Sequence, residues 1–436
     1  MRPCLLLVPL FALAALPSLA SANGGQAHVH ISDLALERMD PGELRDLIER
    51  HQGIVRGGSI FPDSGYAVSD PYGEISHWEP FITAYVEWMR GHFDDLESDE
   101  ALEHRAFVLG AASHGMADQY YDRIFLRRIR EVDGDDSDSD AATDVFLIVE
   151  HDRMVELEVW APEMDLISLY SEAMGHEVSA DTLETGVDRI GAALSLLILS
   201  ARRRYENDWN AYPWAADNYY VPGVRGSLQD CAQTIEAYWI AVDARIEGTD
   251  DPDQHLVLRT VPADGEENVA VDRESVDSWV SIPFGYGIDE ATLTGDTLIV
   301  RDPEGAIIPT NVRTSDSMTQ IQPDADWAYD TVYTVEVGTG ITTLEGKQLS
   351  EPQIFSFRTR CSPDALDDCP PLPEPWTMPS MPPVDPFPDP IDMGPPDLGP
   401  PDAGISEPED DGGCSVTGGS SAPLALAALL FVRRRR

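Results

Sequence analysis

The sequence predicts a multidomain protein in which a mainly α-helical domain is followed by an all-β sandwich. Over residues 31–246 the apolar residues recur mainly at helical spacing. Over residues 256–359 short runs rich in Val, Ile and Thr alternate with Gly, Pro and Asp turns, a spacing that favours a β-sandwich. The length of 436 residues also exceeds what one compact domain usually holds.

We expect the helical domain to occupy residues 23–250. Its clearest helix spans residues 186–205, where one stripe is apolar. That stripe consists of Ile190, Ala193, Leu194, Leu197 and Ile198. Three further segments are predicted to be helices: residues 43–51, 81–92 and 101–118.

We expect the β domain to occupy residues 254–360, with strands at residues 279–283, 297–300, 331–337 and 353–358. The phrase TVPADG at residues 260–265 is followed by NVAVD at residues 268–272 and later by a GKQL turn. These phrases resemble the bacterial Ig-like modules that are often appended to surface enzymes. The resemblance implies that the sandwich is an Ig-like domain.

Residues 1–22 have the composition of a signal peptide. Arg2 is basic, residues 5–16 are apolar, and residues 20–22 fit the small-residue cleavage rule. We therefore expect a secreted protein whose mature chain starts near Asn23. Cys4 precedes the apolar stretch and leaves with the signal peptide.

The C-terminal end predicts a spacer and an anchoring tail. Residues 361–411 are dominated by Pro, Asp and Met without an apolar period, which predicts an extended spacer. Residues 412–436 contain Cys414, an apolar stretch of about eleven residues and terminal arginines, whereas a membrane span needs around 20 residues. This order resembles the C-terminal sorting tails of myxobacterial surface proteins, which implies processing near Cys414 and attachment to the cell surface or outer membrane. A weak tail anchor is the alternative.

The remaining cysteines fall into two classes. Cys361 and Cys369 flank a short Pro/Asp loop, so in an oxidising compartment we expect a disulfide between them. Cys231 lies in a helical pattern and is expected to be a buried free thiol.

The charge of the chain excludes one class of partner. With 78 acidic and 29 basic residues, the formal net charge is −49. This charge repels nucleic acid and anionic membrane surfaces at long range. A nucleic-acid-binding module is therefore not expected.

Four segments place His and Asp in patterns that suit a metal ion. They are AHVHISDLAL at residues 27–36, GSIFPDSGY at 58–66, SHWEPF at 76–81 and SHGMAD at 113–118. His114 and Asp118 are four residues apart, so they lie on one face of a helix and both can reach one ion. His and Asp offer the nitrogen and oxygen ligands that zinc accepts.

In their order and spacing these segments resemble the zinc-dependent phospholipase C family over residues 27–152. That family includes bacterial phospholipase C and the catalytic domain of glycosylphosphatidylinositol-specific phospholipase D, and it shares a helical fold with P1-type nucleases. The resemblance implies a first zinc site of Asp63, His77, His114 and Asp118, with His28 on a neighbouring ion that shares Asp118. It also implies that Asp63 is the candidate catalytic base.

The second zinc site is where the chain departs from the family. Relatives place a His, a second His and an Asp or Glu there, whereas the corresponding positions here are Asp122, Asp140 and Asp144, so that His is replaced by Asp twice. An all-carboxylate site is harder and favours calcium, magnesium or manganese over zinc, unless the ion is lost. Asp140 and Asp144 also follow an acidic run at residues 131–138 that fits a solvated loop without any ligand.

Other candidate ligands stay outside the predicted centre. Glu150, His151 and Asp152 compete for the second site, although a helix surface is the simpler interpretation. The histidines that match no ligand position are expected to be surface or structural residues: His30, His51, His92, His104, His176 and His255.

The sequence therefore predicts a secreted, surface-anchored, zinc-dependent phosphodiester hydrolase of the phospholipase C type, acting on phospholipids or related phosphodiesters. The resemblance implies two to three zinc ions, with calcium, magnesium or manganese as alternatives at the second site. Two other interpretations stay open: a non-catalytic surface or adhesion protein that keeps the metal domain as a scaffold, and a secreted S1/P1-type nuclease. The headgroup, the phosphoester bond that is cut and the oligomeric state do not follow from the sequence.

Overall fold

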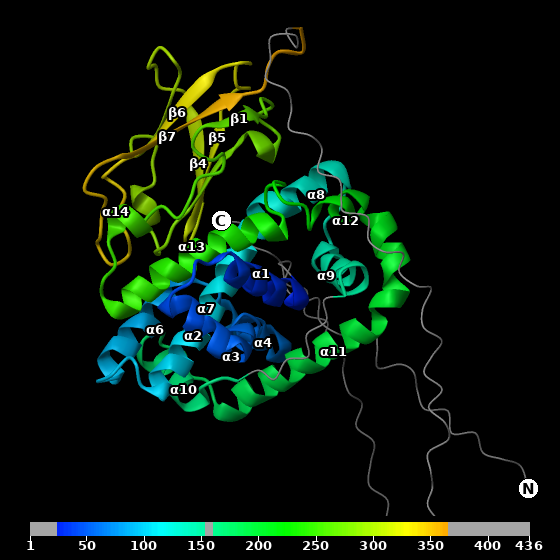
Figure 1. Cartoon of the computed structure of the whole chain (residues 1–436), viewed down its shortest axis with the longest axis vertical. Coiled ribbons are helices and arrows are strands. Elements are labelled where there is room, and N and C mark those ends of the chain that lie inside the picture. Colours follow the sequence, from blue (N-terminus) through cyan, green and yellow to red (C-terminus); the bar gives the residue numbers. More distant parts are fainter. Residues whose placement is uncertain (1–23, 153–159, 365–436) are drawn as a thin grey trace, which may run out of the picture. The chain divides into compact units, whose positions relative to one another are not determined.

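A computed structural model describes residues 24–152 and 160–364 of the chain. In that part the helices come first and the strands follow, which confirms the predicted order of a helical and a β domain (Figure 1). The expected signal peptide, most of the expected spacer, and the tail with Cys414 lie outside the described residues. None of the described helices is long and apolar enough to cross a membrane.

Helices occupy most of residues 25–255. In chain order they are α1 (Gly25–Arg38), α2 (Glu43–Arg50), α3 (Gln52–Gly58), α4 (Phe61–Val68), α5 (Tyr72–Ser76), α6 (Glu79–His92), α7 (Asp99–Tyr120), α8 (Leu126–Val132), α9 (Ser139–Glu150), α10 (Glu163–Glu172), α11 (Ala180–Ala211), α12 (Pro213–Asn218), α13 (Leu228–Glu247) and α14 (Pro252–His255).

The four helices that the sequence predicts correspond to α2, α6, α7 and α11. α11 extends beyond the predicted residues 186–205 at both ends. Its N-terminus is set by Ser179, whose hydroxyl accepts a hydrogen bond from the backbone N–H of Thr182 at 3.1 Å. Within the predicted apolar stripe, Ile190 and Leu194 are the fully buried members.

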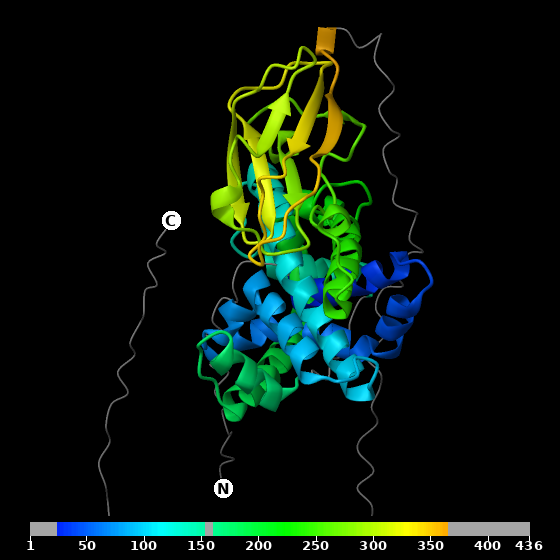
Figure 2. The same cartoon turned by 90° about the vertical axis from the view of Figure 1, so that its left-hand side faces the viewer.

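α7 is the central helix of the helical domain. Ser98 caps it by accepting a hydrogen bond from the N–H of Ala101. Almost every α7 residue from Ala101 onward is buried, because α1, α3, α6 and α13 pack around this helix. Figure 2 shows α7, in cyan, running beside α13, in green. A helix that is covered on all sides can keep His114 and Asp118 away from bulk water.

Two glycines allow α3 to lie closely against α7. A Cβ atom on Gly110 would lie 2.2 Å from the carbonyl oxygen of Val55, and a Cβ atom on Gly58 would meet the α7 backbone at a similar distance. No larger residue fits at either position. The close approach brings Ser59, which follows α3, next to His114.

The β domain contains two sheets. Its strands are β1 (Glu266–Val269), β2 (Val280–Pro283), β3 (Leu298–Arg301), β4 (Thr310–Ser315), β5 (Met318–Pro323), β6 (Val332–Val337) and β7 (Gln353–Thr359). One sheet has the order β1-β7-β6-β3 and the other has the order β2-β5-β4. β1 pairs with β7 in parallel, and the other neighbours are antiparallel. The predicted strand segments correspond to β2, β3, β6 and β7.

A single hydrophobic cluster fills the space between the two sheets. Val280 and Ile282 of β2 join Val335, Val337 and Phe357 of the other sheet in this cluster. The side chains alternate between buried and half-buried along β3 and β7, as expected for strands with one covered face. The sandwich predicted from the spacing of the strand segments is therefore present.

β5 is buried along its whole length because it packs on two sides. Ile321 belongs to the core of the β domain, whereas Met318 belongs to the hydrophobic cluster of the helical domain. At the same boundary, Gln320 donates a hydrogen bond to the carbonyl of Arg123 at 3.2 Å, and Arg123 donates one to the carbonyl of Thr314 at 3.0 Å. The boundary between the domains is thus both apolar and hydrogen-bonded.

The cysteines agree with the sequence where they are described. Cys231 on α13 is a buried free thiol, as predicted. Cys361 is disulfide-bonded. Its predicted partner, Cys369, lies outside the described residues.

Candidate metal centre

Five side chains from four separate segments meet inside the helical domain. His28 comes from α1, Asp63 from α4, His77 from the residue that ends α5, and His114 and Asp118 from α7. Each is at most 8% exposed. These are the residues that the sequence assigns to the first metal site and its neighbour, so the fold brings that predicted set together.

The ligand atoms of this centre face one another at short range. The Nε2 atoms of His77 and His114 lie 2.9 Å apart. An oxygen of Asp63 lies 3.6 Å from His77 Nε2 and 3.8 Å from His114 Nε2. One oxygen of Asp118 lies 3.5 Å from His77 Nε2 and 3.4 Å from His114 Nε2.

Backbone carbonyls determine which nitrogen of each imidazole carries its proton. His77 Nδ1 lies 2.5 Å from the carbonyl oxygen of Gly73, and His114 Nδ1 lies 2.7 Å from that of Ser59. A carbonyl only accepts hydrogen bonds, so each Nδ1 must donate its N–H. In the neutral rings the two Nε2 lone pairs then point toward each other, which is unfavourable unless a cation or a proton lies between them. This arrangement is typical of metal-binding histidines, whose other nitrogen is held by an outer partner.

Asp118 is placed to bridge two positions. Its second oxygen lies 3.0 Å from Nε2 of His28, while the first faces His77 and His114. The ring of His28 stacks on that of His114 at a centroid distance of 3.8 Å. Two groups of three residues each have ligand atoms that all lie within 4.8 Å of one another. One group is His77, His114 and Asp118, and the other is His28, Asp63 and His114. Two overlapping groups of this kind fit adjacent metal ions.

The surroundings of His77 and His114 shift the pKa values of the two rings in opposite directions. Burial disfavours a proton on His77, but the hydrogen bond that His77 donates to Asp63 and the charges of Asp118 and Asp63 outweigh it and raise the pKa of His77 to about 9. Burial, together with the neighbouring His28 and His77, holds the pKa of His114 well below its ordinary value. His114 is therefore the ring that stays neutral and keeps its lone pair available.

Asp144, a predicted second-site ligand, is engaged by the backbone of α1. Its carboxylate accepts hydrogen bonds from the N–H groups of Gln26 at 3.0 Å and Ala27 at 2.8 Å. These N–H groups belong to the first turn of α1 and have no partner within the helix. Burial raises the pKa of Asp144 to about 7. Asp144 thus anchors the turn that carries His28.

The other two predicted second-site residues, Asp122 and Asp140, lie in segments outside the five-residue centre. Asp122 lies in a single π-helical turn, Tyr121–Phe125, which joins α7 to α8 and changes the direction of its side chains relative to an α-helix. Asp140 lies in the first turn of α9, and burial raises its pKa to about 6, with a further contribution from the charge of Asp63. Within the described residues, none of the compact groups of ligand atoms contains Asp122, Asp140 or Asp144.

Two members of the competing trio and three of the remaining histidines have contacts away from the centre. Glu150 accepts a hydrogen bond from Tyr205 at 2.6 Å, and His151 stacks on Tyr220 at 3.9 Å. His30 is buried and shares a hydrogen bond with Tyr220 at 2.9 Å. His104 contacts Tyr85 and His176 contacts Asp70.

Three features of the centre were missed in the sequence. The carbonyls of Ser59 and Gly73 orient the rings, but backbone groups leave no mark in a sequence. Gly115 allows α7 to approach the His77 segment, since a Cβ atom there would lie 1.9 Å from the carbonyl oxygen of His77. Tyr66 lies with its ring 5.0 Å from that of His77. Of these features, only Gly115 could have been noticed in the sequence, because it directly follows His114 in the phrase SHGMAD.

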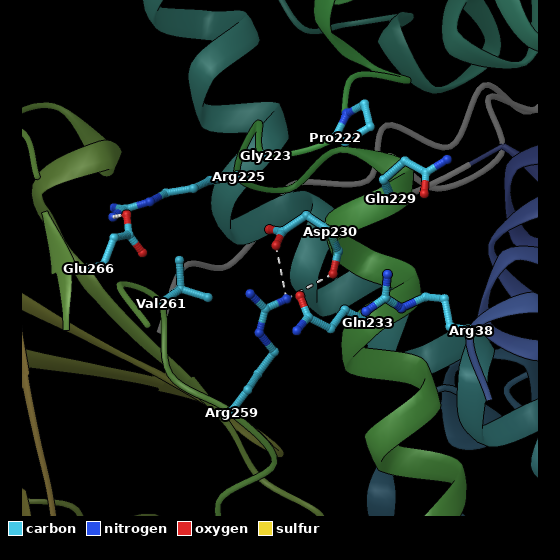
Figure 3. A pocket seen from close by; sticks show the side chains of 10 residues that line it. All are labelled: Arg38, Pro222, Gly223, Arg225, Gln229, Asp230, Gln233, Arg259, Val261 and Glu266. Atoms are coloured by element: carbon cyan, nitrogen blue, oxygen red, sulfur yellow. Dashed lines mark hydrogen bonds and ion pairs between the residues drawn. The ribbon is translucent and has the colours of Figure 1, made fainter. Parts of the chain in front are cut away.

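A separate cavity of about 330 Å³ lies between α13 and the start of the β domain (Figure 3). Two of its three arginines pair with carboxylates that also line the cavity: Arg259 pairs with Asp230 at 2.9 Å, and Arg225 pairs with Glu266 at 2.6 Å. None of its lining residues belongs to the five-residue centre. This cavity is therefore distinct from the metal centre.

The two domains are similar to different known proteins. A family model described as a bacterial Ig-like domain matches residues 251–359. The chain is 31% identical over 192 residues to phosphatidylinositol-glycan-specific phospholipase D of Mus musculus, covering 40% of this chain and 22% of that protein. The Homo sapiens protein of the same name is 28% identical over 196 residues, covering 40% of this chain and 23% of that protein. The chain thus spans about a fifth of the length of these relatives.

Solved structures add nothing to this picture. The N-terminal part of the bacterial S-layer protein SbsC is 13% identical and covers 77% of both chains, with a TM-score of 0.21. A score this low carries no argument about fold or function.

The geometry and the comparisons agree on the broad character of the chain. Its N-terminal region is distantly homologous to phosphatidylinositol-glycan-specific phospholipase D and contains buried His/Asp clusters suited to metal ions. The chain therefore joins a helical region related to a phospholipase to a bacterial Ig-like domain.

Proposed function

We propose that the chain is a zinc-dependent phosphodiesterase of the phospholipase C type, which hydrolyses phospholipids or related phosphodiesters. The observation that carries this proposal is the pair His77 and His114, whose Nε2 atoms meet at 2.9 Å beside the carboxylates of Asp63 and Asp118. The distant homology to a phospholipase supports a phosphodiester as the substrate class.

The five residues of the centre have distinct roles in this proposal. One zinc ion would be held by Asp63, His77, His114 and Asp118. A second would be held by His28 and the other oxygen of Asp118. When bound, zinc supplies Lewis-acid stabilisation of phosphoryl oxygens and makes water a nucleophile near neutral pH. Asp63, which faces the centre from α4, is the proposed general base.

The flanking carboxylates are proposed to hold at most one further cation. Asp144 is already hydrogen-bonded to the backbone of α1. Asp122 and Asp140 are the remaining candidates, and oxygen ligands alone favour calcium, magnesium or manganese over zinc. Metal analysis of the purified protein distinguishes two zinc ions from two zinc ions with a harder cation.

We also propose that the protein is secreted and attached to the cell surface or outer membrane. The signal-like residues 1–22, the tail with Cys414 and the Ig-like domain support this location. A Cys414→Ser variant expressed in the native host should be released from the membrane fraction into the medium. Retention of this variant on the membrane would favour a simple tail anchor.

The enzymatic proposal is tested with the full mature chain loaded with zinc. Phosphatidylcholine vesicles, phosphatidylinositol vesicles, bis(p-nitrophenyl) phosphate and single-stranded DNA are the probes. We expect hydrolysis of lipid and chromogenic diester, loss of activity in Asp63→Asn, and full activity in the control His255→Asn. Cleavage of DNA alone would favour a nuclease. If no probe is cleaved and His114→Ala changes only thermal stability, the domain is a non-catalytic scaffold.

A further inference from the structure

The turn between β4 and β5 of the β domain contacts two segments that carry residues of the candidate metal centre. The carboxylate of Asp316 accepts a hydrogen bond from the backbone N–H of Glu79 at 2.8 Å. The backbone N–H of Ser317 donates to the side-chain oxygen of Gln119 at 3.2 Å, and Gln119 Nε2 donates to the hydroxyl of Ser317 at 3.2 Å. Glu79 lies two residues after His77, and Gln119 follows Asp118 directly.

Asp316 of the β domain caps the N-terminus of α6, which has no side-chain cap from its own N-cap residue. Glu79 is the first residue of α6, and Trp78, which precedes it, provides no side-chain cap. The first N–H groups of a helix have no partner within the helix. Asp316 supplies that partner from the other domain, and its carboxylate also suits the positive end of the helix dipole. The residue that begins α6, two positions after His77, is held in this way.

Gln119 connects the same turn to the helix that carries the other ligands. Its Nε2 also donates to the carbonyl of Gly115 at 3.3 Å, and Gly115 is the α7 residue that packs against the carbonyl of His77. Ser317 is 1% exposed and Gln119 is 5% exposed, so these hydrogen bonds form away from water. Met318, the next residue, packs in the hydrophobic cluster of the helical domain. The contact is therefore buried and built from both polar and apolar groups.

We propose that the β4–β5 turn of the Ig-like domain is a positioning element of the metal centre, with Asp316 and Ser317 as its positioning residues. This inference rests on the proposed function, because it assigns the turn a role in holding the metal ligands. The turn fixes the segment after His77 and the α7 residue next to Asp118. The Ig-like domain is then a part of the working centre rather than an independent module carried behind it.

The first experiment measures zinc affinity of the full mature chain by competition with a chromogenic chelator. Asp316→Ala removes the cap of α6, and we expect its zinc affinity to fall by about tenfold, the lower end for outer partners of metal ligands. Asp316→Asn keeps an oxygen acceptor and tolerates the same backbone conformation, so it should retain nearly full affinity. Rescue by Asn and loss with Ala would distinguish positioning from a general loss of charge.

Asp330→Ala is the matched control. Asp330 has φ of 52° and Asp316 has φ of 50°, so both substitutions place Ala in the same left-handed conformation. The carboxylate of Asp330 pairs with Arg358 inside the β domain. We expect Asp330→Ala to leave zinc affinity unchanged, although it destabilises the β domain by a similar amount.

A second variant covers the case in which Asp316→Ala does not fold. Ser317→Ala removes one hydrogen bond to Gln119 without altering the turn, and we expect about threefold weaker zinc binding, in keeping with the net worth of one hydrogen bond. Unchanged affinity in both folded variants would overturn the inference while leaving the proposed function intact. Zinc binding without phosphodiester hydrolysis would overturn the proposed function, and the affinities would still decide the inference.

Discussion

The Nε2 atoms of His77 and His114 lie 2.9 Å apart, and each ring has its other nitrogen against a backbone carbonyl. Two neutral imidazoles in these tautomers repel each other at this distance. A proton on His77, whose pKa is raised to about 9, or a metal ion between or beside the rings removes that repulsion. The packing of the helical domain therefore favours a positive charge, from a proton or a metal ion, beside these two nitrogen atoms.

Metal removal should destabilise the protein. We expect a chelator to lower the thermal unfolding midpoint and added zinc to restore it, because a ligand present at 100 times its Kd adds about 2.7 kcal/mol to the unfolding free energy. His114→Ala should lose most of the zinc-dependent shift, whereas His255→Ala should keep it. Differential scanning calorimetry with and without zinc measures both. Equal shifts in the two variants would argue against zinc at this centre.

Replacing Gly115 with Ala should damage the centre. The added Cβ would lie 1.9 Å from the carbonyl oxygen of His77, so α7 and the His77 segment must move apart. We expect a destabilisation of about 1–3 kcal/mol, as for other overpacked sites, together with weaker zinc binding. The control is Gly191→Ala in α11, where nothing lies within 4 Å of the added atom. Because Ala favours helix over Gly, that control should stabilise the protein by up to about 1 kcal/mol.

Asp144 should act mainly on the position of α1. Asp144→Ala leaves the N–H groups of Gln26 and Ala27 buried without their carboxylate, and we expect a loss of about 1–2 kcal/mol of unfolding free energy, as for a lost helix cap. Asp144→Asn should lose less because it retains an acceptor. Urea unfolding gives the stabilities, and metal analysis gives the stoichiometry. A full equivalent of metal lost from a folded Asp144→Asn variant would show that Asp144 is itself a ligand.

Stability should fall as the pH rises through the range in which Asp316 ionises. Burial, and the charge of Glu79, raise the pKa of Asp316 from 3.8 to about 7. Between those values the native state binds more protons than the unfolded state, so unfolding free energy decreases with pH, by at most about 1.4 kcal/mol per unit of pKa difference. Below about pH 4 the contribution of Asp316 to the unfolding free energy is fully present.

Asp316→Asn tests this pH dependence because it cannot ionise. Relative to the wild type, we expect its advantage in unfolding free energy to grow as the pH rises from about 4 to about 8. Asp330→Asn, which removes an exposed carboxylate of the β domain, is the control for the loss of one negative charge. Urea unfolding at several pH values provides the measurement. Parallel profiles for Asp316→Asn and the wild type would show that Asp316 does not ionise over this range.

The sequence located the principal helices and strands because their signals are local. The apolar stripe of α11 and the alternation in β3 and β7 follow from periodicity alone. β1, β4 and β5 were not predicted as strands. β5 is buried on both sides by two different domains, so the alternation that marks a half-buried strand is absent.

For the metal centre, the sequence determined the identities of the five residues, since His and Asp in recognisable phrases carry that information. The tertiary structure decided everything that depends on contacts distant in the chain. It placed the Ser59 carbonyl against His114, the Asp144 carboxylate against the first turn of α1, and Asp316 at the start of α6. The physical reason is that these partners are backbone groups or residues more than 50 positions away, and only packing fixes which of them meet.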